Sequence, residues 1–562
     1  MIKLNLMTNI TFKCLIIIVF TIIPGVIIGQ ITGIYDPEIR FKTDNDTYQY
    51  AGPGLNGVQV SMYYHNDEDL QNLALFDRSG NKLWAFKYEN SQYTLDLSLS
   101  SEFPDNLNGF ALLRDLNSDG TPEIFTRGIF GISVFEKKLT WELRAESLFY
   151  LRNNTLLTIP ISFDDIPVIK DLDADSDLDM LIFDMNDGEL IRYFKNVSVE
   201  TFNHNDSLIF ELADFSWANF AECNCGEYGF GEVCENLGER VKHAGGKSLL
   251  VTDISGDNLP DMLLGHEDCA PIYYFENTGD SATFFKSFSE NIFVNGQLQK
   301  LTFPSIFYED LDQDGLEDII ISSNLRESTN LSHDWSETLF FFKGESGDQY
   351  NYDNNNGITN QMLDLGENAA PLFLDVDNDG DQDLLIGSNK NTDGVLSGTL
   401  SLFLKNEEGY QLEDKDFLSL RKLNILDPRP SLTDLDGDGS KELAIYVYDF
   451  INFSGKLLIS KLQNRSWQPL QETGFVAGVE DYVTFFDWDN NGLDDIILGK
   501  SSGELELWLN QGNDIFILSE NNFLGFAPGL ENSFNKPYIY QHHDLNLLIL
   551  VNASGKISLY PD

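Results

Sequence analysis

One acidic pattern recurs seven times along the chain and constrains the fold more than any other feature. In its fullest form, Asp375–Asp383, it reads DVDNDGDQD, with acidic side chains at places one, three, five and nine and glycine at place six. Every copy has an oxygen-bearing side chain at these four places. The positions are Asp115, Asn117, Asp119 and Glu123; Asp171, Asp173, Asp175 and Asp179; Asp253, Ser255, Asp257 and Asp261; Asp310, Asp312, Asp314 and Asp318; Asp375, Asp377, Asp379 and Asp383; Asp434, Asp436, Asp438 and Glu442; and Asp487, Asp489, Asn491 and Asp495.

The spacing of these side chains suits a hard cation. Calcium takes six to eight oxygen ligands at about 2.3–2.6 Å, and a tight loop can aim alternate side chains at one point. Place six must turn sharply, which favours a residue that tolerates positive φ. Five copies have glycine there, and Asn258 is an acceptable substitute, whereas Ser176 is a poorer one and predicts some distortion of the second loop. The sequence therefore predicts up to seven Ca²⁺ sites.

Two other interpretations of the pattern are less satisfactory. An EF-hand needs a bidentate glutamate at place twelve and flanking helices, but place twelve is never acidic here and short β-like runs flank each copy. A metal-free turn is plausible for any single copy, because Asp, Asn and Gly are ordinary turn formers. Seven copies in register argue against it for the set, since converging carboxylates without a cation repel one another.

These units resemble the FG-GAP/VCBS repeats of integrin-α-like β-propellers. The resemblance is carried by the DxDxDGxxD loops, the apolar run after each loop and the Gly-containing turn into a third strand, as in Gly387-Ser388 and Gly499–Gly503. It covers roughly residues 55–562. It implies a propeller fold and calcium binding at the 28 positions above, with Ser255 and Asn491 departing from the usual acidic ligand. The family includes adhesion receptors, lectin-like proteins and some enzymes, so the resemblance implies no particular ligand.

The repeat also predicts the architecture. First-place spacings of 53 to 82 residues suit four-stranded antiparallel blades with the loop between the first two strands. Residues 58–88 and the tail after residue 537 repeat the theme without the acidic loop, which makes nine units by literal count. Because terminal strands of such rings often share a blade, we expect an all-β propeller of eight blades, with seven or nine open. Residues 30–54 are a linker or a closing strand.

Charge and the N-terminal segment indicate where the protein acts. The formal net charge of −54 excludes sequence-independent nucleic-acid binding, which needs a basic face. Residues 1–29 are typical of a secretory signal, with Lys3 and Lys13 before an apolar run. A membrane anchor is the alternative, but Pro24-Gly25 interrupts a run shorter than about 20 residues. We therefore expect a secreted or cell-surface protein with no stable membrane span after cleavage.

Four cysteines remain beyond this segment, and three of them lie in an insert of about residues 200–247. An even number in a secreted chain predicts two disulfides of undetermined pairing among Cys223, Cys225, Cys234 and Cys269. The string CNCGEYGFGEVC resembles the C-terminal half of an EGF module, although the other EGF cysteines are missing. We favour a cross-linked loop over a partner-binding protrusion, and zinc binding is weaker because no histidine has finger spacing.

Catalytic motifs are absent from the sequence: it contains no GxSxG, HExxH or P-loop. His266-Glu267-Asp268 could form a metal or acid–base cluster, but we favour a polar turn, and the same holds for His542-His543. The expected function is thus non-catalytic binding of a surface protein or glycan. The alternative is a lyase-like enzyme acting on acidic polysaccharides, which should gather basic residues on one face; the sequence offers no such cluster.

Overall fold

A computed structural model gives the fold of most of the chain. It describes residues 41–42, 48–49, 58–64, 71–78, 80–89, 92–153, 155–185, 188–231, 234, 246–267, 269, 272–280, 283–290, 303–311, 314–325, 338–345, 349–353, 358, 363–392, 395–463, 466–526, 535–542, 545–552 and 557–561. The predicted signal, residues 1–29, lies outside this set. Within it, no helix is both long and apolar enough to cross a membrane.

The chain divides into two compact units. The five-sheet unit comprises residues 52–364 and 391–395, and the four-sheet unit comprises residues 1–51, 365–390 and 396–562. Nine sheets of three or more strands follow one another along the described chain. Their number equals the literal count of sequence units and lies at the upper end of the expected range.

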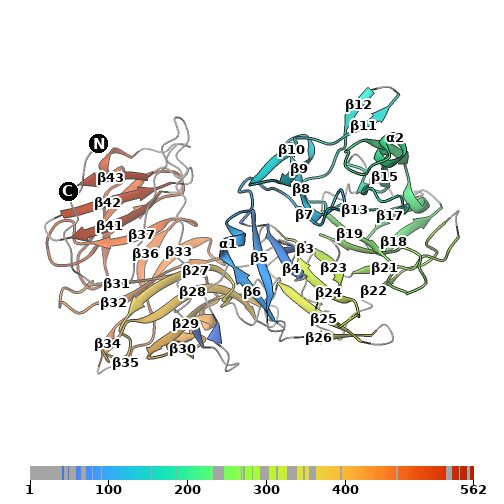
Figure 1. The fold of residues 1–562 in the computed structure, drawn as a ribbon. Helices are drawn as coiled ribbons and strands as arrows, with labels where there is room; N and C mark the ends of the chain where they lie inside the picture. The colour runs from blue at the N-terminus through green and yellow to red at the C-terminus, as the bar shows by residue number, and fades with distance from the viewer. Residues whose placement is uncertain are drawn as a thin grey trace. The chain divides into compact units, whose positions relative to one another are not determined.

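The five-sheet unit contains the first five sheets (Figure 1). They are β3 (Val58–Tyr64), β4 (Gln71–Asp77), β5 (Lys82–Glu89) and β6 (Gln92–Asp96); β7 (Ala111–Arg114), β8 (Glu123–Gly128), β9 (Gly131–Lys137) and β10 (Trp141–Ala145); β13 (Val168–Lys170), β14 (Asp179–Phe183), β15 (Ile191–Asn196) and β16 (Phe210–Asp214), extended by β11 (Phe149–Arg152) and β12 (Thr155–Thr158); β19 (Lys247–Thr252), β20 (Asp261–His266), β21 (Tyr273–Phe275) and β22 (Ser289–Glu290); and β23 (Pro304–Glu309), β24 (Asp318–Ser323), β25 (Leu339–Glu345) and β26 (Gln349–Asp353). Short elements between them are α1 (Leu97–Ser100), α2 (Ser198–Phe202), η1 (Trp217–Asn219) and the hairpin β17 (Phe220–Asn224) and β18 (Glu227–Phe230).

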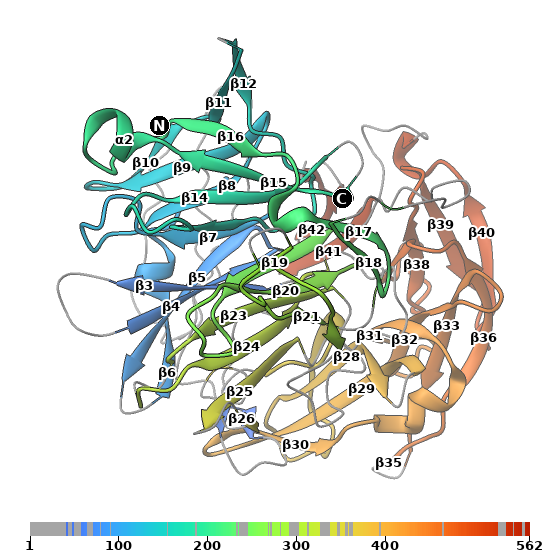
Figure 2. The same ribbon diagram turned by 90° about the vertical axis from the view of Figure 1, so that its right-hand side faces the viewer.

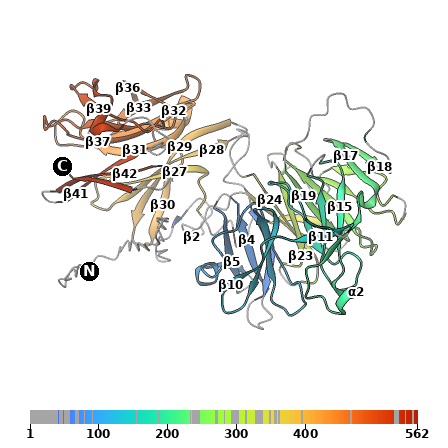
Figure 3. The same cartoon turned by 90° about the horizontal axis from the view of Figure 1, so that it is seen from above.

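The four-sheet unit contains the other four sheets, of which those of β27 and β31 lie side by side (Figure 3). They are β27 (Glu367–Leu374), β28 (Asp383–Thr392), β29 (Val395–Asn406) and β30 (Gly409–Asp414), extended by β1 (Phe41–Lys42) and β2 (Tyr48–Gln49); β31 (Leu426–Thr433), β32 (Glu442–Asp449), β33 (Ser454–Ser460) and β36 (Gln471–Ala477); β37 (Tyr482–Phe486), β38 (Asp495–Gly499), β39 (Leu505–Asn510) and β40 (Phe516–Glu520); and β41 (Lys536–His542), β42 (Leu545–Val551) and β43 (Ile557–Pro561). Short elements are β34 (Leu462–Gln463), β35 (Ser466–Trp467), η4 (Phe417–Leu423) and η5 (Phe523–Gly525).

Apolar side chains bury the faces between consecutive sheets. Between the fourth and fifth sheets, Leu263, Ile306 and Ile321 belong to one buried cluster. Between the seventh and eighth, Tyr446 and Ile496 belong to another. Each second strand is an apolar run that alternates between its two covered faces, which is the pattern of a strand buried on both sides. Face-to-face packing of successive antiparallel sheets is the architecture of a β-propeller, and the chain is an all-β protein of this class.

The five sheets of the first unit close on themselves. Gln59 of β3 donates to the backbone oxygen of Gly109, which precedes the second sheet, and to the side chain of Asn324, which follows β24 of the fifth sheet, at 3.3 and 3.0 Å. Arg78, between β4 and β5, also donates to the backbone oxygen of Asn324, at 2.7 Å. The first sheet therefore lies between the second and the fifth (Figure 2).

Candidate metal loops and the cavity of the five-sheet unit

All seven acidic loops occupy the same place in their sheets. Place one directly follows the first strand, and place nine is the first residue of the second strand. The expectation that each loop joins the first two strands is therefore confirmed. Of the 28 predicted positions, Asp312 is the one that lies outside the described residues.

The turn at place six has the same form in every loop. Its φ is positive in all seven, from 66° at Asn258 to 98° at Gly380. Its backbone N–H donates to the place-one carboxylate at 2.7–3.1 Å in each loop. Ser176 adopts a φ of 77° and keeps this bond, so the distortion expected at place six of the second loop does not occur there.

Place nine supplies a buried carboxylate. Its exposed fraction is 0–5% in all seven loops, and it accepts a bond from the place-two backbone N–H at 2.7–3.2 Å. In five loops its other oxygen accepts a backbone N–H in or just after the third strand, at 2.8–2.9 Å. Burial raises the pKa of Glu123 to about 7 and that of Asp179 to about 6. Such a carboxylate is costly to ionise without a nearby cation.

The donor set of the loops fits a hard cation. In the second, fifth and sixth loops, carboxylate oxygens from places one, three and nine lie within 4.8 Å of one another. One ion with oxygens at about 2.3–2.6 Å can span that separation. In the third loop the buried Oγ of Ser255 has no hydrogen-bond partner among the described residues, which leaves it free to act as a ligand.

Three loops also have a lysine from the third strand or just beyond it. Lys195 pairs with Asp173, Asp175 and Glu200, the last two at 3.3 and 2.5 Å. Lys343 pairs with Asp314 at 3.1 Å, and Lys461 with Asp436 at 2.8 Å. These ammonium groups offset part of the acidic charge, most of all in the second loop.

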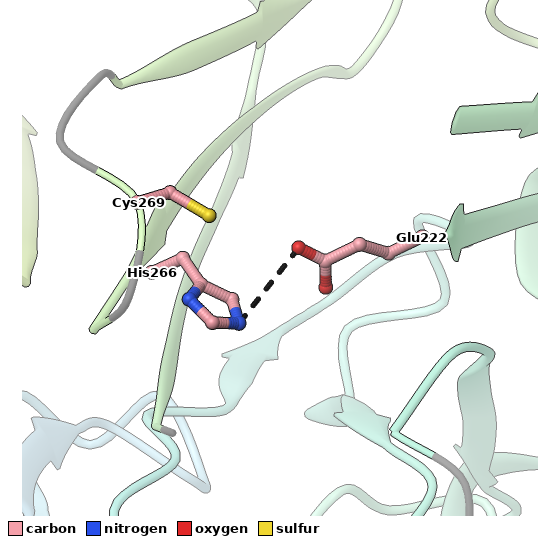
Figure 4. Close-up of side chains that lie close together, drawn as sticks. All are labelled: Glu222, His266 and Cys269. Atoms are coloured by element: carbon pink, nitrogen blue, oxygen red, sulfur yellow. Dashed lines mark ion pairs between the residues drawn. The ribbon is translucent and has the colours of Figure 1, made fainter. Parts of the chain in front are cut away.

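The cysteines form two disulfides, as expected. Cys223 bonds to Cys234, and Cys225 bonds to Cys269, so the hairpin β17–β18 is cross-linked to the chain after β20. Figure 4 shows Cys269 beside His266 and Glu222, three buried residues whose ligand atoms lie within 4.8 Å. Because the sulfur of Cys269 is bonded to Cys225, it is not a thiolate and cannot ligate a metal in this state.

The histidine predicted to lie in a polar turn is instead a buried strand residue. His266 ends β20 with no exposed surface, and its Nε2 lies 3.9 Å from Oε1 of Glu222 (Figure 4). Lys247, also buried, lies 2.5 Å from Oε2 of the same glutamate. Lys247 and Glu222 therefore form a buried ion pair, and His266 lies beside it. Asp268 and His543 lie outside the described residues.

A cavity of about 350 Å³ lies among the first strands of the five-sheet unit. Residues of β3, β7, β13, β19 and β23, one strand from each sheet, line it. Much of the lining is aliphatic, including Val60, Leu112 and Val168. The charged lining residues gather where the first strands meet the acidic loops, because Arg114, Lys170 and Glu309 each directly precede place one of a loop.

The two cations of this cavity hold backbone and hydroxyl oxygens of the next sheet. Arg114 donates to the backbone oxygen of Ile169 at 3.1 Å, and Lys170 donates to Thr252 Oγ1 at 3.2 Å. Neither forms an ion pair with a carboxylate among the described residues, although the nearby charge of Glu309 favours the protonated form of both. Burial lowers the pKa of Arg114 to about 10, and burial together with the Arg114 charge lowers the pKa of Lys170. Burial and the charge of Glu317 raise the pKa of Glu309.

Sequence reasoning missed this cluster. It found no gathering of basic residues, because Arg114 and Lys170 are 56 positions apart in an acidic chain. One signal was present: both occupy the position directly before an acidic loop. Since that position ends the first strand of each sheet, comparing it across the seven copies would have brought the two residues together.

Known proteins resemble this chain in structure but not detectably in sequence. No protein-family model matches the chain, and no curated protein sequence does. Similar solved structures include an Agrocybe aegerita lectin that recognises terminal N-acetylglucosamine, with 12% identity, TM-score 0.22 and coverage of 80% of this chain and 96% of that one. The exo-β-1,3-galactanase 1,3Gal43A of Clostridium thermocellum has 11% identity, TM-score 0.24 and coverage of 93% and 92%. The NanB sialidase of Streptococcus pneumoniae has 10% identity, TM-score 0.23 and coverage of 91% and 68%. At these scores the fold assignment rests on the sheets described above.

Proposed function

We propose that the chain is an exported, calcium-stabilised β-propeller that binds a protein or glycan at the cell surface without catalysing a reaction. The observation that carries the calcium part is the seven-fold recurrence of one loop with one hydrogen-bond pattern and one buried carboxylate. Place nine accepts backbone N–H groups, and its being acidic as well as buried in every copy favours a bound cation. The proposal also makes the chain a member of the FG-GAP/VCBS class.

The role of calcium in this proposal is structural. Each ion would tie together the end of the first strand and the start of the second, and so lower the entropy cost of ordering a long polar loop. The backbone bonds of places one and six already pre-shape the loop. Bound cations would also offset the charge of 25 acidic ligand positions, which otherwise repel one another.

The disulfides support an extracellular setting, and the net charge narrows the class of partner. The disulfides Cys223–Cys234 and Cys225–Cys269 are of a kind that persists in oxidising compartments. The net charge of −54 favours a well-solvated, self-repelling protein and disfavours nucleic acid as a partner.

The binding role is tested with purified protein in calcium and in excess EDTA, on a glycan array and in a pull-down from intact cell surfaces. We expect a defined set of glycans or one surface protein to be retained in calcium and lost in EDTA. Binding that is identical in both buffers contradicts a calcium-stabilised surface. Release of unsaturated products from acidic polysaccharides would show a lyase instead of a binding module.

A further inference from the structure

The charged cavity of the five-sheet unit has features that the calcium loops do not explain. Its cations bond to oxygens of the neighbouring sheets, and the charge of the lining residue Glu309 offsets both without a direct ion pair among the described residues. The chain as a whole carries 90 acidic and 36 basic residues, so two lining cations that share this carboxylate are unexpected. Arg114 is half-buried and Lys170 is exposed, and an anionic ligand would give each of them a charge-assisted partner.

Asp115, which also lines the cavity, does not supply that anion. Its two carboxylate oxygens accept the N–H groups of Asp119 and Gly120 at 3.2 and 2.9 Å, which directs the group into its own loop. The side-chain charges left for a ligand are therefore those of Arg114, Lys170 and Glu309.

The three charged side chains together suit a ligand that has hydroxyl groups as well as a negative charge. A guanidinium and an ammonium can hold a carboxylate, the guanidinium through two parallel N–H donors. Glu309 would repel a simple anion, but as an acceptor it suits the hydroxyl groups of a ligand. The aliphatic lining of Val60, Leu112 and Val168 suits the C–H face of a small ring.

The size of the cavity limits the ligand. A volume of about 350 Å³ lies near the lower end of the range for ligand pockets, about 300–1,000 Å³. One ring fits this space, whereas an oligosaccharide or a folded peptide does not. A ligand with a carboxylate, several hydroxyl groups and one ring is an acidic monosaccharide.

We propose that this cavity binds one acidic sugar residue, with Arg114 and Lys170 holding its carboxylate and Glu309 accepting its hydroxyl groups. This inference deepens the proposed binding function by assigning it a site and a ligand class. The residue can be a free sugar acid or the end of a glycan chain, because the same chemistry recognises both.

The first test is calorimetry of the full, calcium-loaded protein with glucuronate, glucose, acetate and inorganic phosphate. We expect glucuronate to bind at least about tenfold more tightly than glucose, acetate or phosphate, since each lacks one of the two recognised features. Equal binding of glucose shows that the cations are not used, and equal binding of acetate or phosphate shows a plain anion site; either result overturns the proposal. A glucuronate-terminated oligosaccharide that binds as tightly as the monosaccharide identifies a glycan end as the source, and weaker binding identifies the free acid.

The second test uses matched variants. Lys170→Gln and Arg114→Gln should each weaken glucuronate binding about tenfold or more, because each removes a charge-assisted bond. Lys138→Gln, at an exposed lysine outside the cavity lining, removes the same charge and should leave binding unchanged. Lys170→Arg keeps the charge and should restore most of the affinity. If Lys170→Gln binds like the wild type, or if Lys138→Gln is equally impaired, the assignment is wrong.

Acetate binding by a Glu309 variant distinguishes ligand binding from a purely structural role of these three residues. Glu309→Gln should strengthen acetate binding by removing a repulsive charge, a change that a loss of folding cannot produce. Melting curves in calcium check that each variant is folded. Calcium-dependent glycan binding that is insensitive to Lys170→Gln leaves the proposed function intact and refutes this site. Glucuronate binding that survives EDTA leaves this site intact and refutes the role of calcium.

Discussion

The two units use the same acidic loop but differ in the residue that precedes it. In the five-sheet unit that position is charged in three loops out of four, whereas in the four-sheet unit it is uncharged in all three. The residues are Arg114, Lys170, Thr252 and Glu309 in the five-sheet unit, and Leu374, Thr433 and Phe486 in the four-sheet unit.

This difference separates stability from recognition. The loop itself barely varies, because places one, six and nine make the same bonds in both units. The neighbouring position makes none of these bonds with its side chain, so it can change without disturbing the loop. In the five-sheet unit it carries the charges of a cavity, and in the four-sheet unit its side chains contribute no charge. The acidic loop thus fixes a strand end, and the residue beside it decides which side chain that end carries.

Chelation should give the largest effect and tests whether the loop serves both units equally. Each site at a calcium concentration about 100 times its Kd stabilises the fold by about 2.7 kcal/mol, so several sites together should raise the melting temperature by many degrees. We expect excess EDTA to lower it, with hydrogen exchange rising in both units. An unchanged melting curve would refute the calcium interpretation, and rising exchange in one unit alone would show that the loops of the other are metal-free.

Removing one ligand should have the next largest effect. Asp375→Ala in the four-sheet unit removes the place-one carboxylate that holds Gly380, and should lower calcium stoichiometry by about one and stability by about 2–3 kcal/mol. Asp434→Ala should do the same in the sixth loop. In EDTA, Asp171→Ala in the five-sheet unit should be less damaging than Asp375→Ala. With one carboxylate fewer in the second loop, the charge of Lys195 offsets a larger share of the repulsion that remains.

Calorimetric titration with calcium and chemical denaturation measure these variants. The control is Asp381→Ala, at place seven of the fifth loop, whose exposed side chain is not among the predicted ligands. It should leave the stoichiometry unchanged. If Asp381→Ala and Asp375→Ala lose the same amount of calcium, the assignment of ligand places is wrong.

Much of this site could be predicted from the sequence because its geometry is local. The spacing of places one to nine, the turn at Gly380 and the strand that begins at Asp383 depend on neighbouring residues, and the structure has them as expected. The cavity could not be predicted in this way. Its two cations meet because five sheets close on themselves through Gln59 and Arg78. The repeat shows which strand ends are charged, but not which sheets meet around a cavity. For the same reason the burial of His266 was missed.

The pH dependence of folding stability should have opposite signs in EDTA and in calcium. In EDTA the pKa of Glu123 in the folded state, about 7, lies above its ordinary value of 4.5, so the folded state binds more protons between these values. Stability should therefore be greatest below about pH 4.5 and fall as the pH rises through 7. In calcium the carboxylate stays ionised, protons compete with the metal, and stability should rise over the same window.

A matched pair of variants compares the two units in this respect. Glu123→Gln in the five-sheet unit and Glu442→Gln in the four-sheet unit both replace a place-nine glutamate whose pKa is raised by burial. Each should flatten the fall of stability with pH in EDTA and weaken calcium binding. Denaturation curves from pH 4.5 to 8 measure the slope. The same slope with and without calcium would show that no metal contacts place nine.

The smallest effect concerns the backbone of place six, where the second and sixth loops form a natural pair. Ser176 has a φ of 77° in the five-sheet unit, and Gly439 has a φ of 82° in the four-sheet unit, where a Cβ would meet no atom of the described residues within 4 Å. A non-glycine residue in this conformation costs about 1–2 kcal/mol. Ser176→Gly removes this cost, but glycine also gives the unfolded chain more conformational entropy. The net effect should be a stabilisation of up to about 1 kcal/mol. Gly439→Ser should destabilise it by a similar amount, and the double variant should be near wild type, since distant sites add. If Ser176→Gly is instead destabilising, the serine hydroxyl makes a contribution in the second loop that glycine cannot replace, and the two units differ in the loop as well as beside it.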